Sequence, residues 1–120
     1  MSKKTLVIGA SLKSSRYSNM AINKLVTHNN EVVAIGLREG TVRGVNIDTE
    51  LVPYESIDTV TLYLNPSRQE AYFNYILSLN PKRVIFNPGT ENPEFYKLLE
   101  QNNINVEVAC TLVLLSIKQY

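Results

Sequence analysis

The sequence predicts an α/β fold in which a doubly wound, mainly parallel five-stranded sheet carries helices on both faces. Short runs rich in β-branched residues alternate with segments of helical periodicity along the whole chain, which is the pattern of successive β-α-β units. Few polar residues interrupt the runs, as is usual for parallel strands buried on both faces. The 120 residues match the length of one domain, so we expect residues 1–120 to form a single domain.

Five segments are expected to be strands because they are short and dominated by branched and aromatic residues. They are Leu6–Ile8, Val32–Ile35, Val60–Tyr63, Val84–Phe86 and Val106–Val108.

Residues 37–58, between the second and third of these strands, contain two glycines and only short apolar pieces. We expect an excursion there, with a short strand near Thr41–Val45 and a turn of helix near Tyr54.

The first helix is predicted between the first two strands. Ile22, Leu25 and Val26 fall at helical spacing. Ser18 is the expected N-cap, and Asn29–Asn30 is expected to close the helix in a left-handed turn.

Asparagine followed by proline marks the later helices, because asparagine caps a helix and proline fits its first position. Asn65–Pro66 and Asn92–Pro93 therefore predict helix starts, and the first of these helices should run to about Leu79, before Asn80–Pro81. The last apolar run, residues 111–117, fits either a strand or a helix.

Composition and charge exclude several classes of protein. No apolar run approaches the roughly 20 residues of a membrane span, and the start lacks the apolar region of a secretory signal, so we expect a cytoplasmic protein. One cysteine and one histidine form neither an internal disulfide nor a common zinc site. Residues 1–38 hold six basic residues and one acid within a chain of net charge +1, which suits a compact anionic ligand rather than a nucleic acid.

The loop after the first strand has the chemistry of a phosphate site. It combines a glycine that permits close backbone approach with hydroxyl groups and two cations, and it leads into a helix N-terminus, where backbone N–H groups attract anions. The candidate residues in this loop are Gly9, Ala10, Ser11, Lys13, Arg16 and Ser18.

The dinucleotide fingerprint Gly-x-Gly-x-x-Gly is absent, because serine stands at its second and third glycine positions. Arg38 follows the second strand, where an enzyme that binds NAD has an acid for the ribose hydroxyls. An arginine at this point fits a ligand with an added ribose phosphate, either NADP or coenzyme A (CoA), better than NAD.

Several short motifs together resemble the small bacterial CoA-binding proteins, whose Rossmann-like fold also occurs in the α-subunit of succinyl-CoA synthetase. The motifs follow one another in the same order over nearly the whole chain. They are Val7–Ser11, Tyr17–Ser18, Arg43–Val45, Val52–Asp58, Asn65–Pro66, Gly89 and Cys110.

The resemblance implies that the first loop surrounds the pyrophosphate of CoA and that the loop after the second strand meets its adenosine end. It also implies that Asn65, Pro66 and Gly89 line the cleft. The expected function is non-catalytic binding of CoA, alone or with a partner protein, because no acid/base pair or activated nucleophile is evident in the sequence.

Two alternatives remain open from the sequence. One is an NADP-dependent oxidoreductase or redox-sensing domain, in which Arg38 reads the ribose phosphate. The other is a scaffold or homodimer without ligand, which the missing glycines favour.

Overall fold

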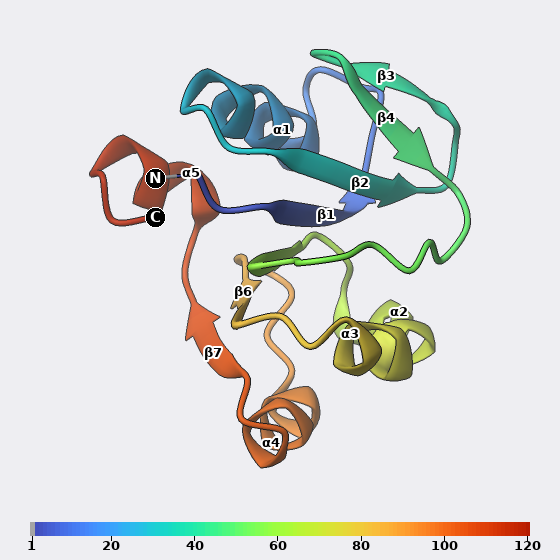
Figure 1. Ribbon diagram of the computed structural model, residues 1–120, viewed down its shortest axis with the longest axis vertical. Helices are drawn as coiled ribbons and strands as arrows, with labels where there is room; N and C mark the ends of the chain where they lie inside the picture. Colours follow the sequence, from blue (N-terminus) through green and yellow to red (C-terminus); the bar gives the residue numbers. More distant parts are fainter. Residues whose placement is uncertain (1) are drawn as a thin grey trace.

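A sheet of seven strands runs through the part of the computed structural model that is described, residues 2–120 (Figure 1). The strand order is β3-β4-β2-β1-β5-β6-β7, and every pair except β3 with β4 is parallel. The strands are β1 (Thr5–Ala10), β2 (Val32–Gly36), β3 (Gly40–Val42), β4 (Val45–Asp48), β5 (Thr59–Leu62), β6 (Arg83–Phe86) and β7 (Asn105–Val108). The predicted mainly parallel α/β fold is confirmed, and the predicted count of five strands is wrong.

The two additional strands form a hairpin inside the segment that was expected to hold one strand. Arg43 and Gly44 both have positive φ, at 50° and 80°, which is the backbone of a two-residue hairpin turn. The turn pairs Val42 with Val45, and β4 then pairs with β2. The turn of helix expected near Tyr54 is also wrong, because residues 51–58 contain no helix.

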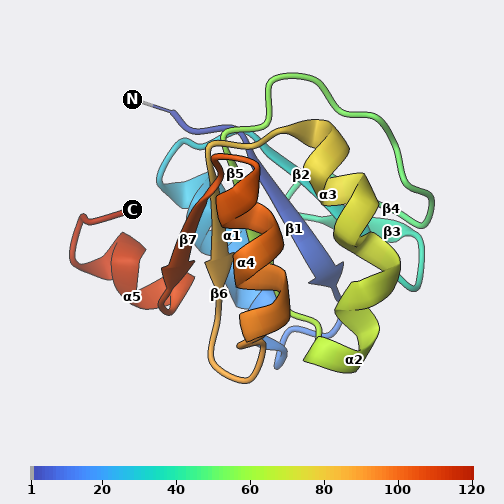
Figure 2. The same cartoon turned by 90° about the horizontal axis from the view of Figure 1, so that it is seen from below.

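Helices cover both faces of the sheet, as the sequence predicted. The helices α2, α3 and α4 lie on one face and α1 and α5 on the other (Figures 1 and 2). Their bounds are α1 (Tyr17–Thr27), α2 (Pro66–Gln69), α3 (Phe73–Leu79), α4 (Pro93–Gln101) and α5 (Thr111–Ser116). Within residues 2–120, no helix has the length and apolar character needed to cross a membrane.

Asparagines at the predicted positions explain four helix boundaries. The side chains of Asn65 and Asn92 accept hydrogen bonds from the backbone N–H groups of Arg68 and Phe95, and each asparagine precedes a proline. Asn29 and Asn80 adopt positive φ at the ends of α1 and α3, as residues that close helices in left-handed turns do.

Two helix predictions are wrong, and the segment that fitted either a strand or a helix is a helix. The helix expected from Pro66 to Leu79 is interrupted by a 3₁₀ turn at Glu70–Tyr72, which separates α2 from α3. Ser18 is not an N-cap, because α1 begins at Tyr17 and Ser18 is buried in its first turn. The apolar run at residues 111–117 forms the helix α5.

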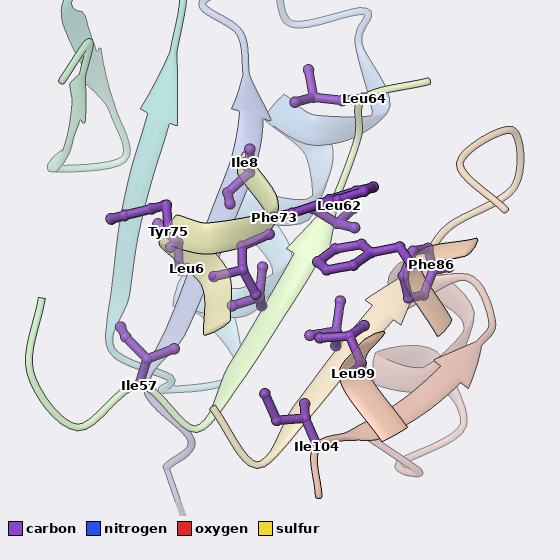
Figure 3. Close-up of a cluster of buried hydrophobic side chains, with 14 of the residues drawn as sticks. Leu6, Ile8, Ile57, Leu62, Leu64, Phe73, Tyr75, Phe86, Leu99 and Ile104 are labelled. Carbon is purple, nitrogen blue, oxygen red and sulfur yellow. The ribbon is translucent and has the colours of Figure 1, made fainter. Parts of the chain in front are cut away.

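The side chains of β1 and β2 alternate between two hydrophobic cores. Leu6 and Ile8 of β1 point to the core under α3 and α4, while Val7 points to the core under α1 and α5. Phe73 and Phe95 stack in the larger core with ring centroids 4.2 Å apart. Figure 3 shows Phe73 in this core together with Leu62 and Phe86. Because both faces are packed, only the ends of the strands are left to form a site.

Candidate functional site

The carboxyl ends of four neighbouring strands, β2, β1, β5 and β6, border a pocket of about 500 Å³. With strands spaced by roughly 4.8 Å, four strand ends span about 14 Å. The order of the strands reverses at β1, since β2 lies on one side of it and β5 on the other. In open α/β sheets such a reversal is the usual place for a ligand.

Nine of the ten residues proposed from the sequence line this pocket. They are Gly9, Ala10, Ser11, Lys13, Arg16, Ser18, Arg38, Asn65 and Gly89. The tenth, Pro66, is not among the lining residues, although Asn65 before it and Arg68 after it are.

Gly9 brings the backbone of the first loop close to β5. Its φ is +92°, and a Cβ atom at this position would lie 2.9 Å from the backbone oxygen of Tyr63. An L-amino acid with a side chain is therefore disfavoured by both its φ angle and the lack of space. Glycine therefore permits the close approach of β1 to Tyr63 at the point where both line the pocket.

The first turn of α1 offers backbone donors to the pocket. Its N-cap is Arg16, and no side chain among residues 2–120 caps the turn. The loop before it is held by two hydrogen bonds, from Asn19 Nδ2 to the Ser11 carbonyl at 2.9 Å and from the Lys13 N–H to Ser11 Oγ at 3.1 Å. A fixed loop that ends in an uncapped helix N-terminus is suited to an anion.

Four positively charged side chains line the pocket, and no acidic residue does so within residues 2–120. We call Lys13, Arg16, Arg38 and Arg68 the pocket cations. All four are exposed, and none forms an ion pair with another residue in the described part of the chain. Their charge is therefore available to a ligand.

Arg68 is the pocket cation that the sequence analysis missed. It lies in the first turn of α2, three residues after the N-cap Asn65. A helix that begins at the carboxyl edge of the sheet carries its first-turn residues beside the ligand site. Arg68 could have been found from the sequence, because the cap predicted at Asn65 places Arg68 in the first turn of a helix.

The other lining residues, which were not among the predicted site residues, are mainly apolar or aromatic. They are Leu12, Tyr17, Gly36, Leu37, Tyr63, Leu64, Tyr72, Pro88 and Thr90. Tyr17 and Leu37 are 69% and 75% exposed. A pocket that combines cations with such exposed apolar side chains suits a ligand with phosphates and an uncharged ring or chain.

The loop after β6 is fixed by Asn87, which is buried. Its carbonyl accepts hydrogen bonds from the N–H and Oγ1 of Thr90, at 3.0 and 2.7 Å, and its side chain donates to the Leu62 carbonyl at 2.9 Å. Gly89 in this loop has a φ of +92°, and its N–H donates to the Glu91 carboxylate at 2.8 Å. The backbone N–H of Gly89 is thus already occupied within the chain.

Tyr63 lines the pocket but directs its hydroxyl into the protein. The oxygen is buried and has no hydrogen-bond partner among residues 2–120, and burial raises the pKa of Tyr63 to about 12. The unfolded chain ionises its tyrosines near pH 10. The contribution of this raised pKa to the free energy of unfolding is therefore fully present below pH 10. It is lost as the pH rises towards 12.

We expect Tyr63→Phe to leave the melting temperature at pH 7 unchanged or slightly higher, because no hydrogen bond is lost. Between pH 10 and 12 the wild type should lose up to about 1.4 kcal/mol per pH unit through this one group, and the variant should not. Thermal unfolding across this pH range measures the difference in slope. Equal slopes for the two proteins would contradict the prediction.

Three solved structures share this fold over 80–99% of their own length. An uncharacterized protein of known crystal structure is 47% identical, with a TM-score of 0.97 over 100% of this chain and 99% of its own. A hypothetical protein from Pyrococcus horikoshii OT3 is 25% identical, with a TM-score of 0.82 over 93% of this chain and 80% of its own. A protein from Thermus thermophilus, cell-free ID.343, is 22% identical with a TM-score of 0.86, covering 99% and 91%.

No curated protein matches the sequence. The family model described as "CoA binding domain" matches residues 3–116, which contain every strand, every helix and the whole pocket. The family predicted from the order of the sequence motifs is thereby confirmed. The chain therefore belongs to the CoA binding domain family.

Proposed function

We propose that the pocket binds CoA by its nucleotide and phosphate end and that the chain does not catalyse a reaction on it. The observation that carries the proposal is the presence of four pocket cations without an acidic residue in the pocket lining of residues 2–120. CoA has a diphosphate and a 3′-phosphate, which together carry a charge of about −4 near neutral pH. The pocket cations match that charge, and membership of the family supports the same ligand.

The parts of CoA divide among the loops as follows in this proposal. The diphosphate lies at the first turn of α1, where Lys13 and Arg16 neutralise it and backbone N–H groups donate to it. Arg38, after β2, binds the 3′-phosphate as a bidentate donor. The exposed apolar side chains at the pocket mouth contact the adenine ring and the start of the pantetheine arm.

NADP is the second ligand to be tested. It also has a diphosphate and a ribose phosphate, so the charge of the pocket does not distinguish it from CoA. The description of the family refers to CoA, and this is why CoA is preferred here.

Isothermal titration with CoA, 3′-dephospho-CoA, NADP, NAD and AMP tests the proposal. We expect CoA to bind most tightly and dephospho-CoA to bind about 10-fold more weakly, because a charge-assisted hydrogen bond is worth about 1.5–3 kcal/mol. NAD binding more tightly than CoA would contradict the proposal, and NADP binding more tightly than CoA would favour the redox alternative.

Thermal unfolding provides an independent measurement. CoA at 100 times its dissociation constant should raise the free energy of unfolding by about 2.7 kcal/mol. If no nucleotide at millimolar concentration shifts the melting temperature, the chain is better explained as a scaffold or homodimer without ligand.

A further inference from the structure

One buried side-chain amide connects two walls of the pocket. Gln69, the last residue of α2, is 0% exposed. Its Nε2 donates to the carbonyls of Leu64 and Thr90, at 2.8 and 2.7 Å, and its Oε1 accepts from Asn92 Nδ2 at 3.1 Å. Both ends of the amide are therefore engaged, as a buried amide requires.

The two carbonyl acceptors belong to different loops. Leu64 is in the loop between β5 and α2, and Thr90 is in the loop between β6 and α4, and both residues line the pocket. Asn92, the third partner, also caps α4 through its Oδ1, which accepts from the Phe95 N–H at 3.3 Å. Gln69 thus joins the wall that carries Arg68 to the wall formed by residues 88–90.

Besides Gln69, the stretch that carries Arg68 is held by the half-buried Tyr72, which packs against the larger core. From Asn65 to Tyr72, Gln69 is the only buried residue, and a 3₁₀ turn separates this stretch from α3. Such a turn within a helix often marks a hinge. The position of the Arg68 backbone relative to the β6 loop consequently depends on the hydrogen bonds of its neighbour Gln69.

We propose that Gln69 is a positioning residue for ligand binding, which fixes Arg68 and the β6–α4 loop at the separation that the ligand phosphates require. This inference rests on the proposed function in so far as CoA is the ligand. The side chain of Gln69 does not line the pocket, so it acts through Arg68 rather than by contact with the ligand.

The test uses a double-mutant cycle. Gln69→Met keeps the size of the side chain and removes all three hydrogen bonds, and we expect it to lower the affinity for CoA about 10-fold. In an Arg68→Ala background the same substitution should lower it less than about 2-fold, because residues that act as one unit are not additive. Tyr75→Phe is the control, since it removes a hydrogen bond to the Val52 carbonyl away from the pocket, and we expect less than about a 2-fold effect.

A milder variant keeps the test valid if Gln69→Met does not fold. Asn92→Asp retains the acceptor that caps α4 and loses the donor to Gln69, and the negative charge that it adds lies at a helix N-terminus, where it is favoured. We expect it to weaken CoA binding about 3-fold, again only when Arg68 is present. Wild-type affinity in both variants, or the same loss with and without Arg68, would overturn the proposal.

Hydrogen exchange separates this inference from the proposed function. In the Gln69→Met protein, amide exchange should become faster in residues 65–72 and in residues 88–92 together, whether or not a ligand is present. If the wild type does not bind CoA, the proposed function fails and the coupling of the walls is still decided by exchange. Faster exchange in only one of the two segments would overturn it.

Discussion

Replacing Gly9 by alanine is expected to lower the melting temperature by about 10 °C and to abolish detectable CoA binding. The φ of +92° disfavours any residue with a Cβ, at a cost of about 1–2 kcal/mol. The new Cβ would also lie 2.9 Å from the Tyr63 backbone oxygen, so β1 and β5 must separate. The combined loss is on the order of 3 kcal/mol, and it displaces the loop that begins the pocket.

Gly44→Ala is the matched control for this experiment. Gly44 also has a positive φ, +80°, but nothing lies within 4 Å of a Cβ atom there. We expect a loss of about 1 kcal/mol and unchanged CoA binding. If thermal unfolding shows the same loss of stability in both variants, the close approach of Gly9 to Tyr63 is not the reason that glycine is needed at this position.

Removal of the two cations of the first loop should weaken binding strongly while leaving the fold intact. We expect Lys13→Ala with Arg16→Ala to weaken CoA about 100-fold, since each charge-assisted hydrogen bond contributes about 1.5–3 kcal/mol. Both side chains are exposed and lack ion pairs with residues 2–120, so the melting temperature of the free protein should change by less than about 2 °C. Titration calorimetry and thermal unfolding measure the two effects.

The control for net charge is the double variant Lys97→Ala with Lys118→Ala. These lysines are also exposed, and they lie outside the pocket lining. The control removes the same number of positive charges, so the change in net charge is the same in both double variants. We expect it to weaken CoA binding less than about 3-fold. If both double variants weaken CoA equally, the first loop is not the phosphate site.

The parts of the fold that could be predicted from the sequence are those fixed by local chemistry. The five central strands consist of apolar runs, and Asn65 and Asn92 each precede a proline, so both kinds of element are visible in a few residues. The hairpin β3–β4 was missed because the pair Arg43–Gly44 lacks the asparagine or aspartate that commonly begins such a turn. In addition, β4 pairs with β2, which is a contact between residues distant in the sequence.

The candidate site also has a part that could be predicted from the sequence and a part that could not. The residues of the first loop are contiguous, and a glycine, hydroxyl groups and cations before a helix indicate their chemistry without a structure. Arg68 and Gln69 could not be separated from ordinary surface residues of α2 until the helix was placed against the sheet. The prediction of Ser18 as an N-cap was wrong because it depended on residue type alone. A turn precedes the helix, in which the Arg16 N–H donates to the Lys13 carbonyl, and the N-cap is Arg16.

The hairpin also changes which backbone groups are exposed at this border of the sheet. Without it, β2 would be the outermost strand on that side and would present its free peptide groups as a template for another chain. The border is instead β3, which is three residues long, and short border strands resist pairing between molecules. The β3–β4 excursion therefore protects the protein from aggregation through β2, next to the loop that carries Arg38.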